Sequence, residues 1–307
     1  MSSFFLLAAA NKAGAPYVGT GIALFGGGYS GGALNTTNKY TYSTAVAVAG
    51  TNLTIAGYNG AATGTATIGL FASGYGYGSS SIIYTYSSNT TAGGTSLLYS
   101  TYGVAAVGNA SVAVFGGGYY VATVNVYTYS GNTVAAGTSL PANTFQLAAA
   151  GNSTVGIFGA GAGGGSTPVV TTSIYTYSGN TNVAGTSFSS AVSTLGACGT
   201  PTMGLFGGGS SATNSAAAAV LLTQTYTYSG NTVGTGTNLN AAHYYVAAAG
   251  NSTVGVFGAG QNTSAVNIAS TSVYNYAAKS VSGGGNLTYS AWAPSATSSN
   301  PGWTGVT

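Results

Sequence analysis

Two short motifs recur six times along the chain, and the distances between them constrain the fold more than any other feature. A strand-like segment ends in Phe-Gly or Phe-Ala, and a Tyr-x-Tyr segment follows it. The interval from each Tyr to the next Phe is identical in all five cases, whereas the interval from a Phe to the following Tyr varies from repeat to repeat. The landmarks are Phe25, Phe71, Phe115, Phe158, Phe206 and Phe257, and Tyr40, Tyr84, Tyr127, Tyr175, Tyr226 and Tyr274. Because length changes are tolerated in surface loops and rejected inside paired strands, each repeat is predicted to be a rigid module with one variable loop.

Each repeat is predicted to contain four short strands. In the fourth repeat they are residues 145–150, 154–158, 173–177 and 182–187. Gly151-Asn152 joins the first strand to the second and Gly179-Asn180 joins the third to the fourth, and both residue types tolerate the positive φ of tight hairpins. The glycines after each phenylalanine suggest strands that crowd toward a central axis. Six such units favour an all-β, six-bladed β-propeller of four-stranded antiparallel blades over an open solenoid, whose repeats are usually shorter.

This arrangement resembles the kelch and galactose-oxidase-like propellers. The matching residues are the hydrophobic-Gly-Gly end of the second strand, as in Phe25-Gly26-Gly27, and the Tyr of the third strand. Two features depart from that pattern: valine (Val134, Val183 or Val233) replaces the expected tryptophan, and no arginine precedes the first strand. The repeated phrases YTYSGNT and GNSTVGIFG also resemble kelch-like repeat proteins of tailed bacteriophages. That second resemblance implies a virion component such as a tail, fibre or decoration protein.

The sequence leaves open how the ring closes. We expect residues 1–293 to form the propeller and residues 294–307 to form a C-terminal tail that docks on the seam or on a neighbour. Residues 12–17 fall where the first strand of blade one belongs, and the stretch from Trp292 falls where a seventh repeat begins. Either terminus is therefore a candidate to cover the seam between the first and last blades.

Charge is almost absent, and this excludes several classes of function. The chain has no Asp, Glu or Arg, and its formal charges are those of Lys12, Lys39 and Lys279. Glycoside hydrolysis needs paired carboxylates, a Ser-His-Asp triad needs an acid, and nucleic-acid binding needs a basic patch. A copper radical oxidase needs more than the single histidine and single cysteine present. We therefore expect no enzyme activity, no cofactor or metal, no nucleic-acid partner and, since no apolar run approaches about 20 residues, no membrane span.

A folded domain of this composition must be covered by Ser, Thr, Asn, Gly and Tyr. Such a surface responds little to salt and suits a dense assembly or an extracellular setting. We therefore expect a non-enzymatic structural protein, located in a virion or outside cells, whose partners are other virion proteins or further copies of itself. A lectin-like module that binds host-surface glycans is the alternative.

One face of the propeller is the predicted binding surface, because the variable loops and the blade-to-blade connections share it. Aromatic rings beside amides suit glycan recognition, although most such tyrosines simply pack between blades. The Tyr-x-Tyr pairs and Cys198 are assigned to packing. The candidate binding residues are Tyr29, Tyr75, Tyr77, Tyr99, Tyr102, Tyr119, Tyr120, His243, Tyr244, Gln261 and Asn262.

Overall fold

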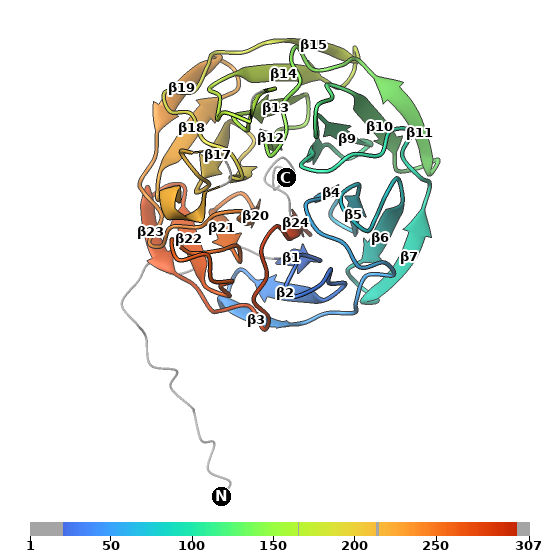
Figure 1. Cartoon of the computed structure of the whole chain (residues 1–307). Helices are drawn as coiled ribbons and strands as arrows, with labels where there is room; N and C mark the ends of the chain where they lie inside the picture. Colours follow the sequence, from blue (N-terminus) through green and yellow to red (C-terminus); the bar gives the residue numbers. More distant parts are fainter. Residues whose placement is uncertain (1–20, 165, 213–214, 300–307) are drawn as a thin grey trace, which may run out of the picture.

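The chain forms a closed ring of six antiparallel sheets, each with four strands, in the computed structural model (Figure 1). The structure describes residues 21–164, 166–212 and 215–299. The prediction of an all-β, six-bladed propeller is confirmed, and the open solenoid is excluded because the first and last blades are joined through one sheet.

The four strands of a blade run outward from the central channel to the rim (Figure 1). The innermost strands, for blades 1 to 6, are β24 (Ser295–Ser298), β4 (Ala61–Gly64), β8 (Ala105–Gly108), β12 (Ala148–Gly151), β16 (Gly196–Gly199) and β20 (Ala247–Gly250). The second strands are β1 (Ile22–Gly26), β5 (Ile68–Ala72), β9 (Val112–Gly116), β13 (Val155–Gly159), β17 (Met203–Gly207) and β21 (Val254–Gly258). The third strands are β2 (Thr37–Thr41), β6 (Ser81–Thr85), β10 (Val124–Thr128), β14 (Thr172–Thr176), β18 (Thr223–Thr227) and β22 (Thr271–Asn275). The outer strands are β3 (Val46–Ala49), β7 (Thr90–Gly94), β11 (Thr133–Gly137), β15 (Thr181–Ala184), β19 (Thr232–Thr235) and β23 (Ser280–Gly283), and a 3-10 turn, η1 (Ala216–Ala218), lies in the variable loop of blade 5.

The fourth repeat shows where the predicted strand bounds were too long. Its first strand begins at Ala148 and not at residue 145, because Gln146 takes a left-handed φ of 54° that breaks the extended backbone. Its last strand ends at Ala184, because the N–H of Thr186 turns away to Asn231 of the next blade (2.9 Å). The middle two strands agree with the prediction to within one position at each end.

The two kinds of hairpin close by different means. In the β14–β15 turn, Asn180 has a φ of 47°, as the positive-φ argument predicted, and the equivalent Asn132 and Asn231 match it. In the β12–β13 turn that argument is wrong. There the Oδ1 of Asn152 accepts the backbone N–H groups of Thr154 (2.9 Å) and Val155 (3.0 Å), so the side chain closes the turn.

The YTYSGNT motif also joins neighbouring blades. Tyr175 Oη donates to Asn180 Oδ1 within the blade, and the same oxygen accepts the N–H of Thr138 from the preceding blade (2.9 Å). Asn89, Asn132 and Asn231 make the equivalent pair of bonds. The motif therefore recurs because each copy ties its own turn to the blade before it.

The hydrophobic core consists of six clusters, each shared by two adjacent blades. The landmark phenylalanines are almost fully buried there. The first tyrosine of each Tyr-x-Tyr pair is buried beside them, which confirms the assignment of these tyrosines to packing. Cys198 is likewise buried, and burial raises the pKa of its thiol to about 12, so it packs as a small neutral side chain.

The C-terminal strand closes the ring. β24 pairs with β1 and gives blade 1 its innermost strand, with Phe25 opposite Ala296. Tyr42 Oη also donates to Ser298 Oγ (2.9 Å) across this junction. The propeller therefore continues past the expected boundary at residue 293, at least to Ser298. The other candidate for this position, residues 12–17, and most of the expected tail lie outside the described residues.

The glycines after the phenylalanines have a different role from the one expected. Gly27 and Gly28 have φ values of 71° and 105°, in the region that favours glycine. A Cβ on Gly27 would lie 2.6 Å from the carbonyl oxygen of Gly57. The cluster therefore forms a left-handed turn that packs against the adjacent connections.

Candidate binding face around the channel mouth

Six equivalent two-residue bridges surround one mouth of the central channel. In each blade, the residue three positions before the inner strand bonds through its backbone to the residue four positions after the landmark phenylalanine. In blade 2, for example, Tyr58 and Tyr75 exchange N–H···O bonds of 3.0 and 2.9 Å. In blade order the bridges are Trp292–Tyr29, Tyr58–Tyr75, Tyr102–Tyr119, Phe145–Ala162, Ser193–Ser210 and Tyr244–Gln261.

Blades 1 to 3 have two aromatic residues at every bridge, and their rings are in contact from blade to blade. The ring of Tyr75 stacks on Tyr58 (centroids 5.1 Å apart) and on Tyr102 (4.2 Å), and Tyr102 stacks on Tyr119 (4.7 Å). The contacts continue in both directions to form one series, which we call the aromatic arc. Its members are Tyr244, Tyr245, Trp292, Tyr29, Tyr58, Tyr75, Tyr102, Tyr119, Tyr120 and Phe145.

Three rings of the aromatic arc are open to solvent, five are partly exposed, and Phe145 and Tyr244 at its ends are buried. Tyr75, Tyr119 and Tyr120 are 44%, 38% and 49% exposed, although tyrosines on the blade strands are buried. A hollow of about 380 Å³ lies against Tyr75, Tyr102 and Tyr119. A second one, of about 370 Å³, lies at the other end of the arc, against Tyr244, Tyr245 and Trp292 together with Gln261. Large rings beside open hollows are typical of recognition surfaces.

The channel mouth inside the arc is polar. The residue after each bridge has a left-handed φ in all six blades, and backbone hydrogen bonds between these turns run from blade to blade around the channel, as from Gly103 N to Asn59 O (2.8 Å). The six residues are Asn59, Gly103, Gln146, Thr194, Tyr245 and Ala293. They line a depression of about 70 Å³, across which Gln146 Nε2 donates to Tyr245 Oη. Amide and hydroxyl groups thus stand at the centre of a surface edged by rings.

Several phenols of this face have a raised pKa. Burial, followed by a hydrogen bond with Tyr75, raises the pKa of Tyr102, and a hydrogen bond with Tyr120 is the first cause of the raised pKa of Tyr119. Burial likewise raises the pKa of Tyr58 and Tyr245. The arc contains no formally charged side chain, so its phenols are hydrogen-bond donors and acceptors on an uncharged surface.

Most, but not all, of the binding residues predicted from the sequence lie in or beside the aromatic arc. Tyr29, Tyr75, Tyr102, Tyr119, Tyr120 and Tyr244 all belong to the aromatic arc, and Gln261 lies beside it. Tyr99 is exposed but makes no ring contact with the arc in the described part of the chain. The Oδ1 of Asn262 accepts the N–H of Ser264 (3.0 Å) within its own loop.

Tyr77 and His243 do not reach the predicted surface. Tyr77 is 3% exposed and packs with Leu53 and Ile82 between blades 1 and 2. His243 is fully buried, with Nδ1 2.9 Å from the carbonyl oxygen of Ala259. Burial lowers the pKa of His243, so the neutral imidazole is a structural group and not a surface one.

Several residues of this face were missed from the sequence. They are Tyr58, Trp292, Tyr245 and Phe145 of the arc, and Asn59, Gln146 and Thr194 of the channel mouth. A usable signal was present, because the first bridge residue follows the first Tyr of the preceding Tyr-x-Tyr pair at the same interval in every repeat. Aligning the repeats on that spacing would have placed Tyr58 and Trp292 in equivalent positions to Tyr102 and Tyr244.

No protein-family model matches the chain, and no curated protein matches it in sequence. No helix in the part of the chain that the structure describes is long and apolar enough to cross a membrane.

Proposed function

We propose that this chain is a non-enzymatic surface-binding propeller that belongs to a virion or another extracellular assembly. The observation that carries the proposal is the aromatic arc, an uninterrupted and partly exposed series of ten rings on the channel-mouth face. Tyr75, Tyr119 and Tyr120 in this series are exposed, whereas rings that serve packing alone are buried, as the landmark phenylalanines are. An exposed apolar surface of this extent on a soluble domain favours a docking role.

The chemistry of the arc favours an uncharged ligand. Without charged side chains, the face offers ring surfaces, phenol hydroxyls and the amides of Asn59 and Gln146. Such contacts are nearly indifferent to salt, because there is no charge to screen. The absence of carboxylates and arginine from the sequence leaves binding, and not acid–base turnover, as the chemistry that this face supports.

A virion setting rests on the repeated phrases YTYSGNT and GNSTVGIFG, which resemble kelch-like repeat proteins of tailed bacteriophages. Uncharged surfaces associate readily, which suits packing against other virion proteins or further copies of the chain. The proposal expects the protein to co-sediment with virus particles and to oligomerise when purified. A stable monomer that never enters particles would count against this setting.

Lectin-like glycan binding is the second candidate function. It is favoured by the closeness of the polar mouth, with Asn59, Gln146 and Tyr245, to the rings of the arc. Rings stack on the apolar faces of sugars while amides and hydroxyls bond sugar hydroxyls.

A glycan array probed with matched variants tests this candidate. Tyr119→Ala and Tyr120→Ala remove exposed rings of the arc, whereas Tyr99→Ala removes a comparably exposed ring (41%) outside it. Lectin-like binding predicts glycans that bind the native chain and Tyr99→Ala but not the arc variants. No glycan bound, or equal binding by all variants, excludes it.

A further inference from the structure

Side chains from the third strands fill the boundaries between blades. The second residue of each third strand faces the connection that arrives from the preceding blade. In blade 3, Asn125 Oδ1 accepts the N–H groups of Leu98 (2.9 Å) and Tyr99 (3.1 Å). Gln224 Oε1 accepts the N–H of Ser190 (3.0 Å) in blade 5, and Asn38 Oδ1 accepts that of Thr288 (2.6 Å) in blade 1. A long amide side chain therefore spans the gap at these three boundaries.

Two other boundaries are spanned differently. In blade 2, Ile82 packs on Leu53 of the connection. In blade 6, the connection itself supplies the amide, because Ser272 Oγ donates to Asn240 Oδ1. Each of these five boundaries thus has a large side chain from one partner or the other.

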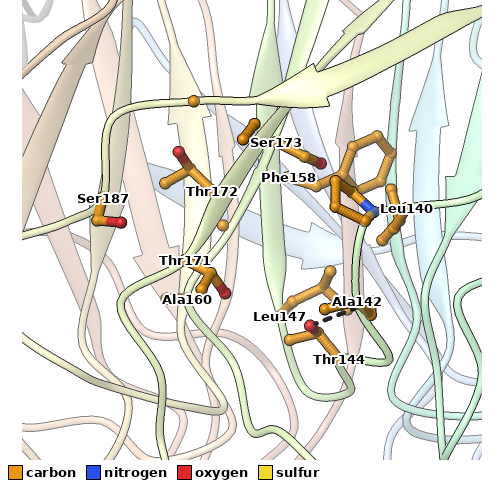
Figure 2. Close-up of a pocket in the computed structure, with 14 residues that line it drawn as sticks. Leu140, Ala142, Thr144, Leu147, Phe158, Ala160, Thr171, Thr172, Ser173 and Ser187 are labelled. Atoms are coloured by element: carbon orange, nitrogen blue, oxygen red, sulfur yellow. Dashed lines mark hydrogen bonds between the residues drawn. The ribbon is translucent and has the colours of Figure 1, made fainter.

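The boundary between blades 3 and 4 departs from this pattern on both sides. Its strand residue is Ser173, and the connection has Pro141 at the position of Leu98, so one of the two backbone N–H groups that Asn125 accepts has no equivalent here. Within the described residues no hydrogen bond joins the Ser173 hydroxyl to the connection, although Ser173 is 4% exposed. The short side chain and the absent donor leave a cavity of about 140 Å³ (Figure 2).

The walls of this cavity define what it can hold. Leu140, Leu147 and Phe158 form much of the lining (Figure 2). Among its hydroxyls, Thr172 donates to Thr186 O (2.9 Å) and Thr144 to Ala142 O (3.5 Å), so Ser173 remains the hydroxyl without a protein partner among these three. The lining favours an uncharged ligand, because it has no charged side chain to pair with an ion and desolvation of an unpaired ion is costly.

We propose that this cavity is a binding site for a small, uncharged, mainly apolar molecule that carries one hydrogen-bonding group, of the size of phenol. An apolar cavity of about 150 Å³ in another protein binds benzene, so the volume is sufficient for one six-membered ring. The ring contacts Leu140, Leu147 and Phe158, and the polar group bonds to Ser173 Oγ. This site lies between two blades, so its occupancy does not depend on the proposed function of the aromatic arc.

Titration of the purified chain with phenol, benzene and benzoate, followed by NMR, tests the proposal. Phenol should bind best, benzene more weakly, and benzoate not at all. Ser173→Asn places the side chain found at Asn125 into the cavity, where its Oδ1 can accept the N–H of Ala142, so this variant should fold and bind phenol at least about tenfold more weakly. Ser88→Asn, the same change in an exposed turn of blade 2, should bind phenol as the native chain does.

A second variant keeps the proposal testable if Ser173→Asn does not fold. Ser173→Ala retains the cavity and removes the hydroxyl, so benzene binding should persist and the preference for phenol should disappear. Absence of phenol binding to the native chain, or phenol binding that neither Ser173 variant changes, overturns the proposal.

Discussion

Blades 1 to 3 have short variable loops and blades 4 to 6 have long ones, and the two groups carry different side chains at the same six backbone bridges. In blades 1 to 3 the landmark Phe and the next Tyr are close together in the sequence, as Phe115 and Tyr127 are, and both bridge residues are aromatic. In blades 4 to 6 this interval is longer, most of all between Phe206 and Tyr226, and the second bridge residue is not aromatic. The residues at that position are Ala162, Ser210 and Gln261. Each bridges again to a later residue of its own loop, as Tyr29 of blade 1 also does to Ala33, so the aromatic side chains, and not this second bridge, distinguish the two groups of blades.

Blade 5 is the clearest contrast with blade 2. Its bridge residues, Ser193 and Ser210, are buried, and the Ser210 hydroxyl lies 2.7 Å from the carbonyl oxygens of both Ala212 and Ser215 in the longest loop. The bridge of blade 5 therefore bonds to its own loop, whereas the bridge of blade 2 carries two stacked tyrosine rings. One scaffold thus presents paired rings at the bridges of blades 1 to 3, the short-loop half, and at most one bridge ring in each of blades 4 to 6, the long-loop half, where Phe145 and Tyr244 lie at the ends of the arc. We expect the two halves to respond differently to change.

Removal of β24, the strand that closes the ring, should reduce stability more than any other change considered. A chain that ends after residue 293 loses β24, its pairing with β1 and the bond between Tyr42 and Ser298. We expect a loss of about 5 kcal/mol or more, a large share of the stability of a typical domain. Thermal unfolding measures it, and a chain that ends after Ser299 is the control. An unchanged midpoint in the shorter chain would show that the ring stays closed without this strand.

Alkaline pH should destabilise the protein next most strongly. Burial raises the pKa of Tyr102 and Tyr245 above the ordinary 10.0, so the folded state holds these protons more tightly than the unfolded state. Their contribution to stability is complete below pH 10 and is lost as pH rises through the folded pKa values. Unfolding at pH 9 and pH 11 should differ less for Tyr102→Phe than for the native chain, whereas Ser193→Ala should leave that difference unchanged.

At acid pH the buried histidine acts in the opposite direction. The pKa of His243 is lowered by burial from its ordinary 6.5, so its contribution is complete above pH 6.5 and is lost as pH falls toward the folded value. We therefore expect a plateau of unfolding temperature from about pH 7 to about pH 10. Stability that declines steadily across this range would contradict these assignments.

Removal of one central ring of the arc should reduce the free energy of unfolding by an intermediate amount. Tyr102→Ala removes the stacking contacts with Tyr75 and Tyr119 and should reduce the free energy of unfolding by about 1–3 kcal/mol. Urea denaturation gives this value, with Tyr99→Ala as the control outside the arc. Equal effects of the two substitutions would mean that the stacked rings contribute no more than an isolated exposed tyrosine.

The smallest effect is expected in the long-loop half. Ser193 Oγ is buried without a hydrogen-bond partner among the described residues, so Ser193→Ala removes an unsatisfied group. We expect a change between zero and a gain of about 1 kcal/mol, measured by the midpoint of urea unfolding. A clear loss of stability would show that this hydroxyl has an essential partner and that the covered half is not merely packed.

Much of the fold was accessible from the sequence because constant spacing is a physical constraint. Paired strands cannot accept insertions, so the constant interval from Tyr to Phe located the rigid part of each blade, and the varying interval from Phe to Tyr located one face. The sequence was less informative about which loop side chains are buried. Tyr77 and Tyr75 lie close together in the same loop, yet one fills the core and the other is 44% exposed, because the loop turns between them at Gly76 with a φ of 86°.

The cavity between blades 3 and 4 illustrates the same limit. Pro141 and Ser173 are ordinary residues in the sequence, and they matter only because the fold brings them to one boundary. The comparison with Leu98 and Asn125 reveals the cavity, because at the equivalent positions between blades 2 and 3 the Asn125 side chain accepts the Leu98 N–H and fills the space. Contacts between residues that are distant in the sequence become known only from the folded structure.

Ligand binding by variants from the two halves of the face tests the central claim most directly. Tyr75→Ala/Tyr119→Ala removes exposed rings from the short-loop half, and Leu221→Ala/Val266→Ala removes exposed apolar side chains from loops of blades 5 and 6. With any surface or glycan that the native chain binds, the first pair should reduce affinity at least about tenfold and the second should leave it within about twofold. Equal losses from both pairs, or a loss from the second alone, would contradict the assignment of binding to the aromatic arc.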